Sequence, residues 1–280
     1  MNYKSTVKLL FLVAALLAST ISQARTASVN GIHLYYEDVG WGKPLIMLHG
    51  GFGDSDMWDP HTALLRFHYR VIKIDSRGHG RSTDIYKDDE AEGGRITYQL
   101  MARDVLALMD KLRIDNAHFV GWSDGAVIAA DIAATQPHRV DQLMLFGAAF
   151  GGNVYNPGFQ SLLNSENLFK DFIDLTYRAA YEAKNPKPRW TKFRDGMYKL
   201  WTTPCYLVSM NPDNCLEPLG GINSATLVVV GEDEIVSFAH TLDVVNAIPD
   251  ASLQVVPLAG HFFPETQPLR ATAIITNFLD

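Results

Sequence analysis

One serine of this 280-residue chain stands where a nucleophile is expected, in the pentapeptide GWSDG at residues 121–125. A serine hydroxyl is weakly nucleophilic at neutral pH, so it needs a base within hydrogen-bonding reach and an acid that orients the base. A buried apolar run precedes Ser123, and a run rich in small residues follows it. This context is typical of a sharp strand-to-helix turn, in which small residues let the backbones come close. We therefore predict that Ser123 is a catalytic nucleophile.

The partners of Ser123 are expected at the ends of other strands. Among the nine histidines, His261 follows the run LQVVPLAG and precedes FFPE, which places it on a loop beyond the last predicted strand. We predict that His261 is the base. Three consecutive acids follow another strand between Ser123 and His261 in the chain, where the acid of such a triad lies. Its spacing from His261 makes Asp233 the predicted acid, and Glu234 is the alternative.

The segment LIMLHGGFGDS carries three glycines directly after a strand. Backbone N–H groups that face developing negative charge stabilise acyl-transfer reactions. We expect two amides to form such an oxyanion hole: that of Asp124, at the start of a helix, and that of Gly51, with the Phe52 N–H as the alternative to Gly51. The side chains of Phe52, Trp122 and Asp124 are expected to contact the substrate.

Positioning these residues requires a sheet whose strands end at one edge. Apolar runs that finish in turn residues indicate strands buried on both faces of a parallel sheet, at residues 44–51, 69–80, 117–125, 141–149, 225–234 and 252–261. Helical patterns lie between them, at residues 97–112, 124–135 and 239–249. The alternation predicts an α/β fold with a mostly parallel, doubly wound sheet. Asn30-Gly31 also predicts a hairpin before the first of these strands.

The alternation stops over residues 151–223, where aromatic residues and prolines are dense and no strand is evident. We predict a mostly helical cap inserted between two parts of one core, residues 25–150 and 224–280. Cys205 and Cys215 lie in a loop-like stretch of this insertion, and we expect them to form a disulfide if the protein is exported. They have no histidine or cysteine neighbours at ligand spacing, so we expect no metal, and we expect no cofactor.

Residues 1–24 have the composition of a secretory signal peptide. Two lysines, a ten-residue apolar run and small residues at 22 and 24 follow in that order, and the run is too short to cross a bilayer comfortably. We predict export to the periplasm or beyond, without stable membrane insertion after cleavage. The formal net charge of −7 becomes −9 when the two lysines are removed, and no basic run is present, which disfavours nucleic-acid binding. The oligomeric state is not predicted.

These motifs, in this order, resemble those of the α/β-hydrolase superfamily over nearly the whole chain after residue 24. The resemblance lies in HGG, DSRGHGRS, GWSDG, GEDEIV and GHFFPE, which follow the third, fourth, fifth, seventh and eighth strands of that fold. It implies Ser123 as nucleophile, Asp233 as acid, His261 as base, and the Gly51 and Asp124 amides as oxyanion donors. The family's acid segment usually has one more residue between its glycine and its aspartate than Gly231-Glu232-Asp233 has.

The resemblance implies a serine hydrolase that cleaves a small-molecule carboxylic ester through an acyl-enzyme intermediate. An aspartate directly after the nucleophile is similar to the biphenyl hydrolase-like, valacyclovir-cleaving branch, in which this position is associated with an α-amino group of the substrate. An equally simple interpretation of Asp124 is a carboxylate favoured by the helix dipole. Two alternatives stay open: a hydrolase of C–C bonds in meta-cleavage products, and a ligand-binding receptor or non-catalytic module of the same fold.

Overall fold

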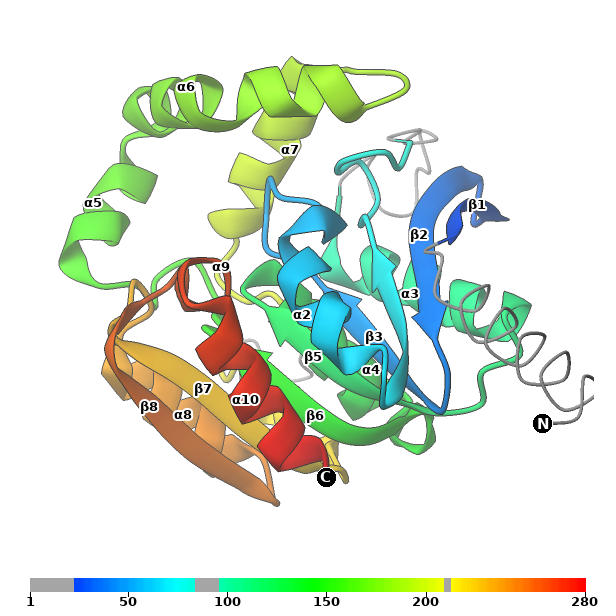
Figure 1. Ribbon diagram of the computed structural model, residues 1–280. Coiled ribbons are helices and arrows are strands. Elements are labelled where there is room, and N and C mark those ends of the chain that lie inside the picture. Colours follow the sequence, from blue (N-terminus) through cyan, green and yellow to red (C-terminus); the bar gives the residue numbers. More distant parts are fainter. Residues whose placement is uncertain (1–22, 84–95, 209–212) are drawn as a thin grey trace, which may run out of the picture.

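The computed structural model describes residues 23–83, 96–208 and 213–280. One eight-stranded sheet runs through the molecule in the order β1-β2-β4-β3-β5-β6-β7-β8 (Figure 1). β2 is antiparallel to both of its neighbours, and the strands from β4 to β8 are parallel. The strands are β1 (Gln23–Val29), β2 (Ile32–Gly40), β3 (Lys43–Leu48), β4 (Tyr69–Ile74), β5 (Ala117–Trp122), β6 (Val140–Phe146), β7 (Ala225–Asp233) and β8 (Ala251–Gly260).

The six strands predicted from apolar runs are confirmed as β3 to β8, and so is the mostly parallel sheet. The hairpin is confirmed as well: Asn30 and Gly31 both have positive φ and join β1 to β2. Such a turn needs positive φ at both central positions, which Asn-Gly tolerates. The strand order reverses beside β3, so the carboxyl ends of β3, β5 and β6 meet at one edge of the sheet.

Helices cover both faces of the sheet. α3 (Tyr98–Lys111), α4 (Asp124–Thr135) and α8 (Phe238–Ala247) lie on one face, and α2 (Asp59–Leu65) and α10 (Pro268–Leu279) lie on the other, with the short α9 (Phe263–Thr266) just before α10 (Figure 1). Each face has its own apolar core, as expected for strands buried on both sides. Thr97 caps α3, because its side chain accepts a hydrogen bond from the Leu100 N–H. Short 3₁₀ segments are η1 (Ser55–Trp58), η3 (Pro137–Arg139) and η4 (Glu217–Gly221).

Three helices are inserted between β6 and β7. They are α5 (Pro157–Asn164), α6 (Glu166–Lys184) and α7 (Trp190–Trp201), and they stand beyond the carboxyl ends of the strands (Figure 1). We call residues 151–222 the helical insertion. The segments that flank these three helices run side by side: Tyr206 N–H donates to the Phe150 carbonyl at 3.1 Å, and Gly152 N–H donates to the Thr203 carbonyl at 2.9 Å. The three helices therefore leave and rejoin the rest of the chain through one narrow neck.

Cys205 and Cys215 form a disulfide within this insertion, with their Cα atoms 5.0 Å apart. The pairing expected of an exported protein is thus present. Residues 1–22 of the predicted signal peptide lie outside the described residues, and Gln23 and Ala24 begin β1. None of the helices that the structure describes is long and apolar enough to cross a membrane.

Candidate active site

Ser123 lies on the sharp turn between β5 and α4. Its backbone has φ +53° and ψ −118°, a conformation that L residues rarely adopt and that aims the side chain away from the sheet. The two flanking glycines are needed for close packing: a Cβ on Gly121 would overlap the Gly125 carbonyl, and a Cβ on Gly125 would overlap the Leu48 carbonyl of β3. The pentapeptide has the context that distinguishes a nucleophile turn from a chance match.

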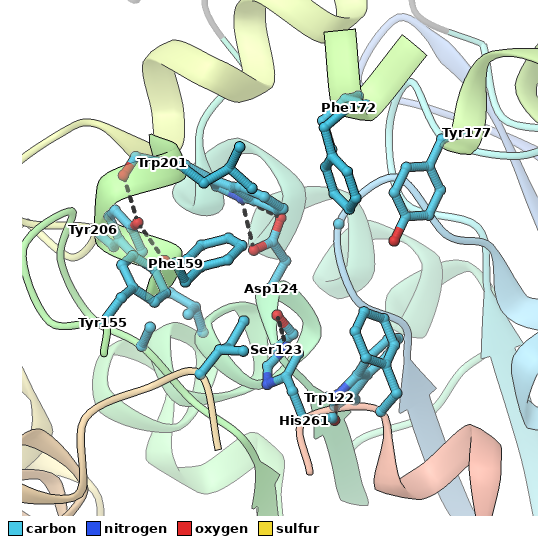
Figure 2. A pocket seen from close by; sticks show the side chains of 17 residues that line it. Trp122, Ser123, Asp124, Tyr155, Phe159, Phe172, Tyr177, Trp201, Tyr206 and His261 are labelled. Atoms are coloured by element: carbon cyan, nitrogen blue, oxygen red, sulfur yellow. Dashed lines mark hydrogen bonds between the residues drawn. The ribbon is translucent and has the colours of Figure 1, made fainter. Parts of the chain in front are cut away.

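A continuous hydrogen-bonded chain runs from the serine to a buried carboxylate. Ser123 Oγ lies 3.1 Å from His261 Nε2 (Figure 2). His261 Nδ1 lies 2.5 Å from Glu234 Oε1. The side chains of His261 and Glu234 are only 6% and 8% exposed. A carboxylate can only accept, so Nδ1 carries the proton and Nε2 is left to accept the serine proton. Ser123 and His261 are brought together as predicted.

The carboxylate that bonds to His261 is that of Glu234, and the prediction that Asp233 would do so is wrong. The pairing of β7 with β8 is irregular between Gly231 and Asp233, and Asp233 ends β7 opposite Gly260 with an exposed side chain. Glu234 is the next residue in the chain. Its Oε1 bonds to His261 Nδ1 and also accepts a hydrogen bond from the Ile235 N–H at 2.8 Å. The sequence contained a signal for this outcome. A segment that runs from Gly231 to Asp233 is one residue shorter than the acid segment usual in the family, whereas a segment that runs from Gly231 to Glu234 has the usual length.

Two further contacts hold the base in place. Trp122 Nε1 donates to the His261 carbonyl at 2.8 Å, which ties the end of β5 to the loop after β8. Gly147, at the end of β6 with φ +55°, leaves room for the imidazole, since a Cβ there would lie 2.8 Å from His261 Nδ1. The position of His261 therefore depends on three neighbouring strands.

The triad opens onto a pocket between the core and the helical insertion. Its walls surround about 780 Å³ of space, part of it open to solvent, and are mostly aromatic and aliphatic (Figure 2). Among the residues that the structure describes, no lysine or arginine lines this pocket. The lining consists of Gly51, Trp122, Ser123, Asp124, Val127, Ala149, Tyr155, Phe159, Leu162, Phe172, Ile173, Tyr177, Trp201, Tyr206, Ile235, His261 and Phe262.

Asp124 places a carboxylate in the wall of this pocket. Tyr98 Oη donates to Asp124 Oδ1 at 2.8 Å. Trp201 Nε1 lies 3.0 Å from both carboxylate oxygens (Figure 2). Burial raises the pKa of Asp124 to about 6, although the Trp201 and Tyr98 hydrogen bonds oppose the shift. Trp201 is the last residue of α7, so Asp124 links the nucleophile turn to the helical insertion. Of the predicted substrate contacts, Asp124 and Trp122 line the pocket.

Phe52, the third predicted substrate contact, does not line the pocket. Its backbone is left-handed, with φ +61°, and its ring is buried among aromatic side chains of α6 and α7. Gly51 lies at the pocket wall, since a Cβ there would be 2.6 Å from Asp124 Oδ2. The oxyanion role of the Gly51 and Asp124 amides stays a prediction.

The other histidines near the site are structural. His49 Nδ1 lies 2.7 Å from the Gly50 carbonyl, and its Nε2 accepts the Ser76 N–H, so it joins the loops after β3 and β4. Burial lowers the pKa of His79 to about 3, and its Nδ1 bonds to the Arg77 carbonyl. Neither competes with His261 for Ser123.

A cluster of acids lies elsewhere on the core. In the described part of the chain, the carboxylates of Glu37, Asp56 and Asp59 are close enough to share a cation. The buried Lys73 ammonium already pairs with Glu37 at 3.2 Å and with Asp59. Asp56 pairs with Arg81 and Lys184, so three side-chain cations face the three carboxylates. None of the three acids lines the pocket.

A mostly parallel sheet with a serine on the turn after β5, an acid after β7 and a histidine after β8 defines the hydrolase class of α/β proteins. The chain matches the family model of the α/β hydrolase fold over residues 43–189, and it belongs to this family.

Its relatives catalyse several reactions. The chain is 28% identical over 268 residues to a 2-hydroxy-6-oxo-6-phenylhexa-2,4-dienoate hydrolase of Burkholderia cepacia, covering 87% of this chain and 91% of the relative. Among solved structures it is similar to a meta-cleavage product hydrolase of Pseudomonas fluorescens, with a TM-score of 0.71, 23% identity, and coverage of 91% and 97%. It is also similar to an enol-lactonase of Burkholderia xenovorans, with a TM-score of 0.68, 22% identity, and coverage of 91% and 99%. The two structures establish the shared fold.

Proposed function

We propose that this hydrolase cleaves carboxylic esters of uncharged, apolar acyl groups through a Ser123 acyl-enzyme. The observation that carries the proposal is the unbroken chain Ser123–His261–Glu234 at the wall of an apolar pocket. A base poised on a serine, and oriented by a buried carboxylate, is the arrangement that makes a hydroxyl attack an acyl carbon.

The reaction runs in two halves. His261 Nε2 takes the Ser123 proton while Oγ bonds to the acyl carbon, and the Gly51 and Asp124 amides hold the oxyanion that forms. Collapse of this intermediate expels the alcohol, which receives the proton from His261. A water molecule activated by the same imidazole then releases the acid and restores Ser123. Glu234 stabilises the imidazolium in both halves, and each oxyanion donor is typically worth ~3 kcal/mol.

The pocket lining favours an uncharged acyl group. A dienoate of the kind named for the Burkholderia cepacia relative carries a carboxylate. A buried carboxylate of a ligand needs a cation or several hydrogen-bond donors. The described lining offers no lysine or arginine and already contains the Asp124 carboxylate. Cleavage of C–C bonds in meta-cleavage products is nevertheless the second candidate, because the 28% identical relative is named for it.

An α-amino acid ester is the narrower version of the ester proposal. It would place a substrate ammonium against Asp124, which lines the pocket and lies beside the Gly51 backbone. Tyr98 and Trp201 already bond to this carboxylate, and those bonds give it a second use, holding the insertion against the nucleophile turn. Comparing kcat/KM for an amino-acid ester and its des-amino analogue tests the narrower version, and equal values would reject it.

The central experiment combines an active-site label with a panel of esters. A fluorophosphonate should label Ser123 in peptide maps, and p-nitrophenyl esters of increasing acyl length should be turned over many times by the wild type and not by Ser123→Ala. A negatively charged succinyl ester of matched length should be a poor substrate. Preferred turnover of a phenyl dienoate over every ester would establish the second candidate instead. Ligand binding without multiple turnover would indicate a receptor-like protein.

We also propose that the protein is exported. The Cys205–Cys215 disulfide supports this, because disulfides persist in oxidising compartments. N-terminal sequencing of protein recovered from the periplasm or medium should begin near Arg25, and recovery of full-length chain from the cytoplasm alone would reject export.

A further inference from the structure

The turn beside the nucleophile contains a residue in an unfavourable conformation. The Gly53 N–H donates to the Gly50 carbonyl at 3.2 Å, which closes a four-residue turn over residues 50–53. The third residue of this turn is Phe52, with φ +61°. A turn with positive φ at its third position normally has glycine or asparagine there. In this turn glycines stand on both sides of the left-handed residue, and a bulky phenylalanine occupies the position itself.

The ring of Phe52 is held by the helical insertion. Five aromatic rings of the described chain lie with their centroids 5.4 to 6.5 Å from it, and all five belong to α6 or α7: Phe169, Tyr177, Trp190, Phe193 and Trp201. Phe52 is only 7% exposed. Its side chain is therefore packed in the insertion, while its backbone belongs to the core loop after β3.

A second set of contacts fixes the same loop to the insertion. Lys184, the last residue of α6, donates to Asp54 Oδ2 at 2.6 Å and to Asp56 Oδ2 at 2.9 Å. The next residue, Asn185, donates to the Ser82 carbonyl at 3.0 Å. The loop after β3 is therefore bound to the insertion in two ways, through the Phe52 ring and through the carboxylates of Asp54 and Asp56.

The sign of φ at the third position decides how the middle of such a turn is oriented. Turns with negative and positive φ there differ mainly by a rotation of the central peptide, here the one between Gly51 and Phe52. That rotation would exchange the directions of the Gly51 carbonyl and the Phe52 N–H. Gly51 lies at the pocket wall against Asp124, where the oxyanion is expected.

We propose that Phe52 is a positioning residue: the aromatic cluster of the insertion holds it left-handed, and this keeps the peptide between Gly51 and Phe52 from turning its carbonyl toward the oxyanion that the Gly51 N–H is expected to bind. The inference rests on the proposed ester hydrolysis. It means that the oxyanion hole is complete only while the insertion is packed on the turn. Phe52 itself does not touch the substrate, so its effect falls on kcat more than on KM.

The test compares Phe52→Gly with Phe52→Ala. Both variants lose the ring, but only glycine adopts positive φ without strain. Phe52→Gly should keep kcat within about 3-fold of the wild type. Phe52→Ala should lose about 10- to 100-fold, less than the roughly 10²- to 10³-fold for complete loss of a donor. If the ring only filled space, the two variants would have equal kcat, or glycine would be the worse because it lowers stability further.

A variant in the insertion keeps the test decisive if the Phe52 variants do not fold. Phe193→Leu removes a ring that packs edge-on against Phe52, and it should lower kcat about 3- to 10-fold. In a Phe52→Gly background the same change should leave kcat unaltered, since the contact is already gone. Tyr198→Leu is the matched control, an insertion aromatic without a ring contact to Phe52, and it should lower the melting temperature alone.

The outcomes separate the two proposals. A wild type without Ser123-dependent turnover or labelling overturns the proposed function, and the inference with it. A wild type that turns over esters, with Phe52→Gly no faster than Phe52→Ala or with Phe193→Leu equally harmful in both backgrounds, overturns the inference alone.

Discussion

Replacing Glu234 by glutamine should cost most of the activity while leaving the geometry of the triad intact. Glu234 Oε1 accepts hydrogen bonds from both His261 Nδ1 and the Ile235 N–H. The amide oxygen of a glutamine can accept the same two bonds, so the imidazole keeps its tautomer and orientation. The variant loses only the negative charge that stabilises the imidazolium formed in the transition state.

The magnitude follows from the distance. The hydrogen-bonded atoms are 2.5 Å apart, so the two charge centres lie about 4 Å apart, and at an effective dielectric constant of about 20 they attract by about 4 kcal/mol. With 1.36 kcal/mol for each factor of ten, Glu234→Gln should lower kcat about 10³-fold. KM should change little, because Glu234 lies behind the imidazole and does not line the pocket.

The control is Asp233→Asn, which removes an exposed charge one residue away and should leave kcat within about 2-fold. Steady-state hydrolysis of a p-nitrophenyl ester measures both variants, and burst titration counts the competent sites. A Glu234→Gln enzyme within tenfold of the wild type would refute the assignment of the acid. So would an Asp233→Asn enzyme as slow as Glu234→Gln.

Three further predictions concern stability. Replacing Cys205 and Cys215 by serine should lower the free energy of unfolding by about 2.7 kcal/mol, the entropy of closing a loop with a sequence separation of 10. Burial raises the pKa of Asp131 to about 6, so the folded state binds more protons than the unfolded state between about pH 4 and pH 6, and stability falls as pH rises through this window. Asp131→Asn should remove the part of that fall that Asp131 contributes, leaving the part due to Asp124, and stabilise the protein at pH 8 by up to about 3 kcal/mol. Lys184→Met should destabilise the protein by up to about 1 kcal/mol at low salt, and the difference from the wild type should shrink at high salt.

Each of these has its own check by denaturant unfolding. A reduced wild type should match the double serine variant, and a loss below about 1 kcal/mol would count against the loop-closure estimate. Asp171→Asn, at an exposed position of α6, should leave the pH dependence unchanged, and so should Asp131→Asn if burial is not the cause. Lys199→Met, at an exposed position of α7, should show no salt-dependent difference from the wild type.

The fold was predictable because its signals are local and repeated. Six apolar runs, each ending in glycine or polar residues, gave the parallel strands, and Asn30-Gly31 and Thr97 marked a turn and a helix start by their own chemistry. Ser123 and His261 were predictable for a related reason, since both lie on short turns directly after strands. Both lie at the same edge of the sheet because parallel strands end there together.

The acid and the role of Phe52 depend on features that a sequence does not display. Asp233 and Glu234 are neighbours, and a strand irregularity near the end of β7 decides which of them faces His261. Phe52 stands between glycines in a loop that lines the site, so a substrate contact was a natural prediction. Its ring instead packs against side chains more than a hundred positions later, and only the assembled insertion shows this.

The narrow neck of the helical insertion has a consequence for how this enzyme could evolve. The segments before α5 and after α7 run side by side, paired through Phe150 with Tyr206 and through Gly152 with Thr203. A segment anchored in this way can change in length and sequence without altering the spacing of the strands that carry the triad. Natural selection could therefore exchange one substrate preference for another by rewriting this segment and keeping the catalytic residues. The dependence of the Phe52 turn on its aromatic neighbours would limit that freedom, since each new insertion must again supply a cluster that fits.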